Sequence, residues 1–169
     1  MIIDPKADDK LATLKPRVDV LPHPQRIFDA WTKGYRYVGI IDHGAMDPIY
    51  TDRLLFYLYQ KFSNFGVYID ELYYIHRQGR AGSGLQAILT RGRSDNITFF
   101  GCTQRPSWIS LFCLSEADYL GQFKLTLEKD RKTMYSIIGN KRVLVNPDKP
   151  YEWFYYDNTS DRLHYFNAQ

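Results

Sequence analysis

Two adjacent carboxylates, Asp70 and Glu71, follow a short apolar run at residues 67–69 and are the strongest chemical signal in the 169-residue sequence. A buried strand that stops at polar residues brings their side chains to one edge of a sheet. At such an edge an Asp can organise a magnesium ion, and a following Glu can polarise an attacking water. The pair can equally be a helix cap beside a solvated charge, and the residues alone leave both interpretations open.

A second polar group follows the apolar run at residues 97–102, which predicts another strand. If the two strands are neighbours, the amide of Gln104 lies beside the two carboxylates, where it can sense a terminal phosphate or hold a water. Arg91 and Arg93 end the predicted helix that precedes this strand. Their charge suits a phosphoryl-transfer transition state, but arginines at a helix end also complement the helix dipole.

Short apolar runs that alternate with helix-length segments must position these residues. The runs at 1–3 and 37–41 stop at Asp4 and Asp42, and a helix is expected between Thr51 and residue 64. A glycine-rich segment at residues 79–84 leads into the next helix. This order predicts an α/β fold with a mostly parallel sheet flanked by helices.

The carboxyl-terminal part of the sequence has a different character. Alternation at residues 123–127 predicts one more strand, and the aromatic runs at 151–156 and 162–166 predict a β-hairpin with its turn at 157–161. We therefore expect a core at residues 1–140 and an extension with an aromatic hairpin at residues 141–169.

The motifs around the carboxylates resemble those of the FtsK/HerA superfamily of DNA-pumping ATPases, in which the strand with its Asp-Glu pair is the Walker B motif. The resemblance covers residues 1–130 and is most specific at residues 67–107. Six short segments carry it: Ile-Ile-Asp-Pro-Lys at residues 2–6, Asp-Glu at 70–71, Thr-Arg-Gly-Arg at 90–93, Thr-Gln-Arg-Pro-Ser at 103–107, Phe-Lys-Leu at 123–125 and Asp-Arg at 130–131.

The resemblance implies the later part of a RecA-like P-loop NTPase core that uses ATP with Mg²⁺. Asp70 would hold Mg²⁺ through water, Glu71 would be the catalytic base and Gln104 the sensor. Arg91 or Arg93 would be an arginine finger that reaches the nucleotide of a neighbouring subunit. The implied function is double-stranded DNA translocation or packaging by a homo-oligomeric ring, with a location in the host cytoplasm or the virion.

The sequence departs from this family at the phosphate-binding loop. Nowhere does it contain G-x-x-x-x-G-K-[ST], and the nearest approach, residues 79–85, lacks the Lys and follows Asp70 instead of preceding it. We expect either that the loop belongs to an upstream segment or that the chain is a non-hydrolysing homologue. Either case predicts weak or absent ATP hydrolysis by these residues alone.

The basic loop at residues 76–84 offers a second hypothesis about DNA. In the pore of a ring, Arg77 and Arg80 would contact DNA phosphates without choosing a sequence. Such glycine-rich basic loops are also common as solvated crossovers.

Composition and charge exclude few other classes. The net charge of +3 permits a nucleic-acid partner, the apolar runs are too short for a membrane span, and Cys102 and Cys113 lack metal-ligand spacing. Two alternatives remain: a non-catalytic nucleic-acid or protein-binding scaffold with an aromatic contact surface, and a metal-dependent nuclease. The nuclease would use four acids at adjoining strand ends, namely Asp4, Asp42, Asp70 and Glu71, while His43 and Lys6 near these ends carry less weight.

Overall fold

The computed structural model describes residues 2–4, 39–41, 48–76 and 80–167. The chain divides into two compact units, Met1–Thr103 and Gln104–Gln169. The expected division at residue 140 remains a prediction about the domains of the whole protein.

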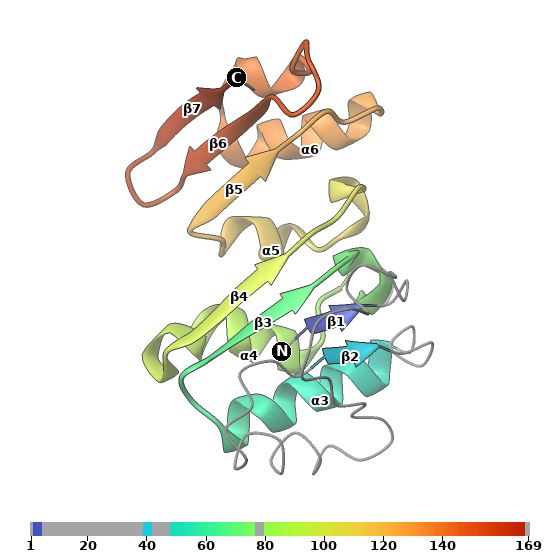
Figure 1. Ribbon diagram of the computed structural model, residues 1–169, viewed down its shortest axis with the longest axis vertical. Coiled ribbons are helices and arrows are strands. Elements are labelled where there is room, and N and C mark those ends of the chain that lie inside the picture. Colours follow the sequence, from blue (N-terminus) through green and yellow to red (C-terminus); the bar gives the residue numbers. More distant parts are fainter. Residues whose placement is uncertain (1, 5–38, 42–47, 77–79, 168–169) are drawn as a thin grey trace. The chain divides into compact units, whose positions relative to one another are not determined.

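The first unit contains a four-stranded sheet in the order β2-β1-β3-β4 (Figure 1). All three strand pairs are parallel, as the apolar runs predict, so the expected mixed α/β fold with a parallel sheet is confirmed. The strands are β1 (Ile2–Asp4), β2 (Gly39–Ile41), β3 (Phe65–Ile69) and β4 (Ile97–Gly101).

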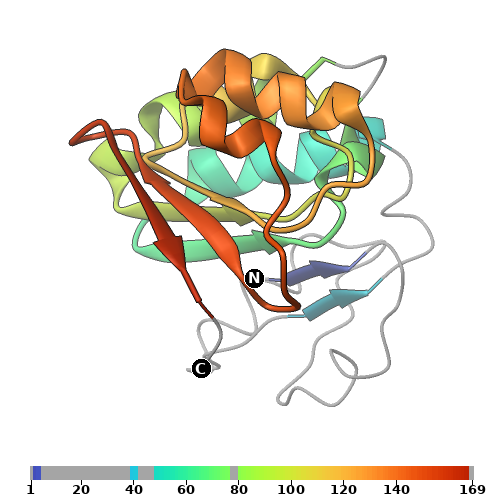
Figure 2. The same cartoon turned by 90° about the horizontal axis from the view of Figure 1, so that it is seen from above.

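Helices α3 (Pro48–Lys61) and α4 (Ser83–Arg91) lie on the same face of β3 and β4 (Figure 2). Side chains alternate along β3, because successive residues of a strand point to opposite faces. Its first, third and fifth residues are buried with the apolar faces of the helices, which makes the core of this unit. The buried core residues include Leu54, Leu55, Leu58, Phe65, Val67, Ile69, Leu85, Ile88 and Ile97.

The second unit contains a three-stranded antiparallel sheet in the order β5-β6-β7. Its strands are β5 (Tyr119–Gln122), β6 (Trp153–Asp157) and β7 (Arg162–Phe166). The last two strands form a hairpin across a turn at residues 158–161. The helices of this unit are α5 (Leu111–Ser115) and α6 (Glu128–Ile138), and short 3₁₀ segments occur in both units: η2 (Leu72–Ile75), η3 (Gly92–Asp95), η4 (Pro106–Trp108) and η5 (Lys141–Leu144).

The strand predicted at residues 123–127 is wrong, because β5 ends at Gln122. The backbone of the next segment is bound by side chains instead of by a strand. The Leu125 N–H donates to Asn146 Oδ1 at 2.9 Å, and the Leu125 carbonyl accepts from Arg131 Nη1 at 2.7 Å. In the segment between β5 and α6, hydrogen bonds from side chains therefore take the place of hydrogen bonds to a neighbouring strand.

Candidate functional site

The predicted carboxylate pair lies directly after the buried end of β3. Ile69, the last residue of the strand, is fully buried. Asp70 is half-buried, while Glu71 is only 3% exposed. The two acids therefore differ in access to solvent, with Asp70 half-buried and Glu71 almost fully enclosed.

The end of β4 lies beside this pair, so the two strands are neighbours, which was the condition for placing Gln104 near the carboxylates. The Cys102 N–H donates to the Ile69 carbonyl at 2.9 Å, and the Leu72 N–H donates to the Cys102 carbonyl at 2.6 Å. Burial raises the pKa of the Cys102 thiol, and the negative charges of Asp70 and Glu71 raise it further. The charges of both acids thus act on the first residue after β4.

Glu71 has an unusual backbone conformation. Its φ of 54° and ψ of 64° place it in the left-handed region, where residues other than Gly, Asn and Asp are uncommon. This turn ends β3 and starts η2, and the N–H of Leu72, the first residue of η2, donates to the Cys102 carbonyl. A strained residue held by its surroundings is typical of functional sites, where the strain fixes a side chain in place.

The strand order places the pair at a topological switch point. The chain leaves β1 toward β2 on one side of the sheet, and it leaves β3 toward β4 on the other side. Ligands of open α/β sheets bind in the crevice that forms where neighbouring strands diverge in this way, outside their carboxyl ends. The pairing of Ile3 with Ile69 also puts the backbone of Asp4 at this edge.

The oxygen donors at this edge suit magnesium. Mg²⁺ usually binds one or two protein carboxylates and completes its shell with waters and phosphate oxygens. Asp70 is the half-exposed acid in this place, with Glu71 next to it. The described residues contain no cluster of three or more His, Cys, Asp or Glu side chains that could hold a metal.

Gln104 is exposed and is the first residue of the second unit, so its place beside the carboxylates remains a prediction. The residues that follow it are bound by a buried acid that we did not single out from the sequence for this role. Asp130 accepts from Arg105 Nε at 3.0 Å and from the Ser107 N–H at 2.9 Å. Although burial opposes it, hydrogen bonding by Ser107 and the charge of Arg105 lower the pKa of Asp130.

The two candidate arginine fingers lie at the opposite edge of the sheet. Arg91 ends α4, and Arg93 belongs to η3, which leads into the first residue of β4. The Asn64 N–H, just before β3, donates to the Asp95 carbonyl of η3 at 3.0 Å. Strand β3 has five residues, each of which advances about 3.4 Å, so it is roughly 17 Å long. This length separates the two arginines from Asp70 of the same chain.

The glycine-rich segment serves helix packing. A Cβ on Gly84 would lie 2.1 Å from the backbone oxygen of Asp52 in α3, so only glycine allows the two helices to approach this closely. Asp52 Oδ1 accepts from the N–H groups of Gly84 at 2.8 Å and Leu85 at 3.2 Å. The amino end of α4, where a phosphate would bind, thus already holds a carboxylate.

The remaining candidates are divided between exposed and undescribed positions. Arg80 is exposed, as a DNA contact requires. Arg77, together with Lys6, Asp42 and His43, lies outside the described residues.

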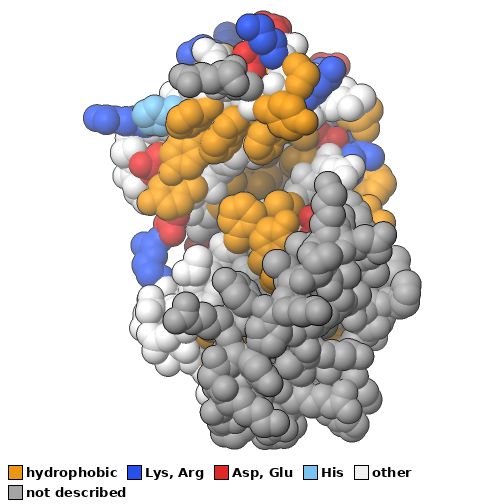
Figure 3. Space-filling model, in the orientation of Figure 1, with side chains coloured by type: hydrophobic (Ala, Val, Ile, Leu, Met, Phe, Trp, Pro, Cys, Tyr) orange, Lys and Arg blue, Asp and Glu red, His pale blue; other side chains and the backbone are white. Residues whose placement is uncertain are grey.

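One face of the three-stranded sheet is lined by aromatic rings, some exposed and some half-buried. Phe123 stacks on Trp153 with 5.5 Å between ring centroids, and Trp153 stacks on Phe166 at 5.0 Å. Tyr119 stacks on Tyr155 at 5.7 Å. Figure 3 shows hydrophobic side chains gathered over this sheet. We call these five residues the aromatic face, since the other face buries Leu120, Phe154 and Tyr156.

No helix in the described part of the chain combines the length and apolar character that a bilayer crossing requires. No family model matches the sequence. A search of curated proteins finds the DNA packaging ATPase P9 of Enterobacteria phage PRD1, which is 40% identical over 73 residues. The match covers 43% of this chain and 31% of that relative, so the chain spans less than a third of the relative's length.

Solved structures show the same kind of fold. The genome packaging NTPase B204 of Sulfolobus turreted icosahedral virus 2, in complex with AMPPCP, matches with a TM-score of 0.77 and 16% identity over 99% of this chain and 82% of that chain. B204, the DNA-packaging ATPase from Sulfolobus turreted icosahedral virus, matches with a TM-score of 0.74 and 18% identity over the same shares. The predicted resemblance is therefore confirmed: in part of its sequence and in its fold, this chain is similar to viral genome-packaging ATPases.

Proposed function

We propose that this chain is part of an ATP-driven motor subunit that packages or translocates double-stranded DNA, with a RecA-like core that acts in a homo-oligomeric ring. One observation carries the proposal: Asp70 and Glu71 lie at the switch point of a parallel sheet whose fold matches packaging NTPases. Such a motor works in the host cytoplasm or on the virion.

The two carboxylates have different roles in this proposal. Asp70, which is half-buried, would hold Mg²⁺ through its waters, and Mg²⁺ would supply neutralisation of the charge on the ATP phosphates. Glu71, which is enclosed and held by its left-handed backbone, orients the attacking water and accepts its proton. Gln104 is the sensor that contacts the terminal phosphate or that water.

The arginines act between subunits. Because Arg91 and Arg93 lie at the sheet edge opposite Asp70, they cannot serve the nucleotide of their own chain. An arginine from a neighbouring subunit stabilises the charge of the transition state in many NTPases. This placement favours a finger in trans, and it also fits a surface role at the end of α4.

The test uses an extended protein, in which a phosphate-binding loop precedes residue 1. We expect ATP turnover that double-stranded DNA stimulates. Glu71→Gln should retain nucleotide binding and lose turnover, because it removes the base and keeps the shape of the side chain. Unchanged turnover in this variant would remove Glu71 from the mechanism. Metal-dependent DNA cleavage without ATP would instead support the nuclease alternative.

The aromatic face supports a second candidate, a non-catalytic binding scaffold. Tyr119 is 57% exposed and Phe123 is 55% exposed, and exposed aromatic clusters are typical of interaction sites. The rings stack on one another, and Trp153 stacks on two neighbours, so fewer ring faces remain for stacking with bases. The arrangement therefore favours a protein partner over a nucleic acid.

Self-association of the 169-residue chain, measured by analytical ultracentrifugation, tests whether the aromatic face is a contact between copies. A scaffold that works through the aromatic face should lose its association in Phe123→Ser combined with Phe166→Ser and keep it in Asp70→Ala. Equal association of all three proteins would exclude this face as the contact between copies.

A further inference from the structure

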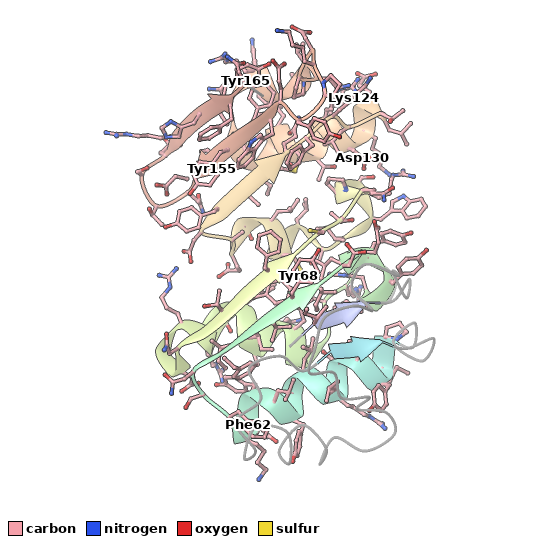
Figure 4. The ribbon with its side chains drawn as sticks, in the orientation of Figure 1. Phe62, Tyr68, Lys124, Asp130, Tyr155 and Tyr165 are labelled. Atoms are coloured by element: carbon pink, nitrogen blue, oxygen red, sulfur yellow. The ribbon has the colours of Figure 1, made fainter. Side chains whose placement is uncertain are left out.

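Asp130 is a buried acid whose two carboxylate oxygens bind different residues. It is the third residue of α6 (Figure 4). Only 1% of Asp130 is exposed. Its Oδ2 accepts from Arg105 Nε at 3.0 Å, and its Oδ1 accepts from the Ser107 N–H at 2.9 Å. A carboxylate with two directed partners fixes both of them, because charged hydrogen bonds in a buried place are strong and directional.

The loop that Asp130 binds is short and held at several points. The Arg105 guanidinium also lies 4.1 Å from the centroid of the Trp108 ring, a cation–π arrangement. Pro106 is buried between the two residues that contact Asp130. Residues 105–108 therefore form one anchored turn that continues into η4.

Gln104 immediately precedes this anchored turn. On its other side, Cys102 is bound to Ile69 and Leu72 by two backbone hydrogen bonds. Between the two anchored points lie only Thr103 and Gln104. Within the second unit, Gln104 is therefore joined directly to Arg105, the residue that Asp130 holds.

We propose that Asp130 is the positioning residue for Gln104. This inference rests on the proposed function, in which Gln104 contacts the terminal phosphate or the attacking water. Asp130 touches neither the nucleotide nor the water. It acts through Arg105 and Ser107, which set the direction in which the chain presents the Gln104 side chain.

Hydrogen exchange on the 169-residue chain tests the mechanical part of the proposal. Asp130→Asn retains an oxygen for the Ser107 N–H and loses the charge that holds Arg105. We expect exchange at residues 103–108 to become roughly tenfold faster in this variant and in Arg105→Ala. Exchange in the last turn of α6 and in β6 should change by less than about twofold. Unchanged exchange at residues 103–108, or equal acceleration throughout Gln104–Gln169, would overturn the proposal.

Kinetics of the extended protein test the catalytic part. We expect Asp130→Asn to lower kcat for ATP by roughly 10- to 100-fold and to leave KM nearly unchanged, because a small misplacement of a catalytic group slows the chemical step. Gln104→Ala should show a similar loss. The double variant should be no slower than Gln104→Ala, because Asp130 then has nothing to position.

The outcomes of this proposal and of the motor proposal are distinguishable. If Asp130→Asn slows turnover by the same factor with and without Gln104, the positioning role is wrong and the motor function stands. If the extended protein hydrolyses no ATP, the motor function fails, and the exchange experiment still decides whether Asp130 holds the loop.

Discussion

The contact between α3 and α4 should be highly sensitive to one methyl group at Gly84. A Cβ there would lie 2.1 Å from the Asp52 carbonyl oxygen and 2.6 Å from the Phe56 nitrogen. Both atoms belong to the backbone of α3, so no side-chain rotation can relieve the clash. Gly84→Ala must therefore push the two helices apart.

The magnitude follows from the distances. Ordinary van der Waals contact begins at 3.4 Å, so the backbones must separate by more than 1 Å where Leu55, Leu58 and Leu85 are almost fully buried. Overpacking of a core costs about 1–3 kcal/mol. The same shift weakens the bonds from Asp52 to the amino end of α4, a cap of about 1 kcal/mol. We expect a loss of about 3 kcal/mol, or roughly 6–12 °C in Tm for a chain of this size.

Thermal and urea unfolding, followed by far-UV circular dichroism, measure this loss, and hydrogen exchange of α4 assigns it to the first unit. Gly66→Ala is the matched control, because its Cβ would lie 3.9 Å from the backbone oxygen of Thr98, which is an ordinary van der Waals distance. The control should change stability by less than about 1 kcal/mol. Wild-type stability of Gly84→Ala would refute the close helix contact, and with it our explanation of the glycine-rich segment.

Three further predictions concern charges. Asp52→Ala should lower the free energy of unfolding by about 1 kcal/mol in urea denaturation, because the first N–H groups of α4 lose their acceptor; no loss would mean that water replaces the carboxylate fully. Because the pKa of Asp130 is lowered, its stabilising contribution is present at neutral pH and is lost as the pH falls through its folded-state pKa, which lies below that of an ordinary aspartate. Asp130→Asn should therefore flatten the acid limb of a stability–pH profile, and an unaltered limb would contradict the assignment. Alanine at Arg91 or Arg93 should abolish turnover of the extended protein, and mixing that variant with Glu71→Gln subunits should restore part of it; absence of rescue would indicate a structural arginine.

The local features of the fold were predictable because burial and strand spacing leave a pattern in the sequence. The apolar run before Asp70 and the run before Gln104 predicted two strands of a parallel sheet, and the structure shows that these strands, β3 and β4, are neighbours. The opposite placement of Arg93 also follows from the order of elements, since a residue just before a parallel strand lies at the edge opposite the strand ends.

The contacts that the sequence did not reveal join residues far apart in the chain. Asp130 and Arg105 are 25 positions apart, and Asp52 and Gly84 are 32 positions apart. Neither pair belongs to a motif with fixed spacing, so only the folded chain brings them together. The strand prediction at residues 123–127 was wrong for the same reason. The alternation of residue types does not show that the Leu125 N–H donates to Asn146 Oδ1, which is 21 positions away in the sequence.

The central claim is that Asp70 forms a magnesium–nucleotide site at the switch point of the sheet. Titration of the extended protein with a fluorescent ATP analogue, with and without Mg²⁺, tests it most directly. Asp95, in η3 at the opposite edge, provides a control acid. We predict that Asp70→Ala weakens the magnesium-dependent binding by about tenfold or more, as expected for the loss of a charged hydrogen-bonding group, and that Asp95→Ala leaves it unchanged. Equal, magnesium-dependent binding by wild type and Asp70→Ala would contradict the claim.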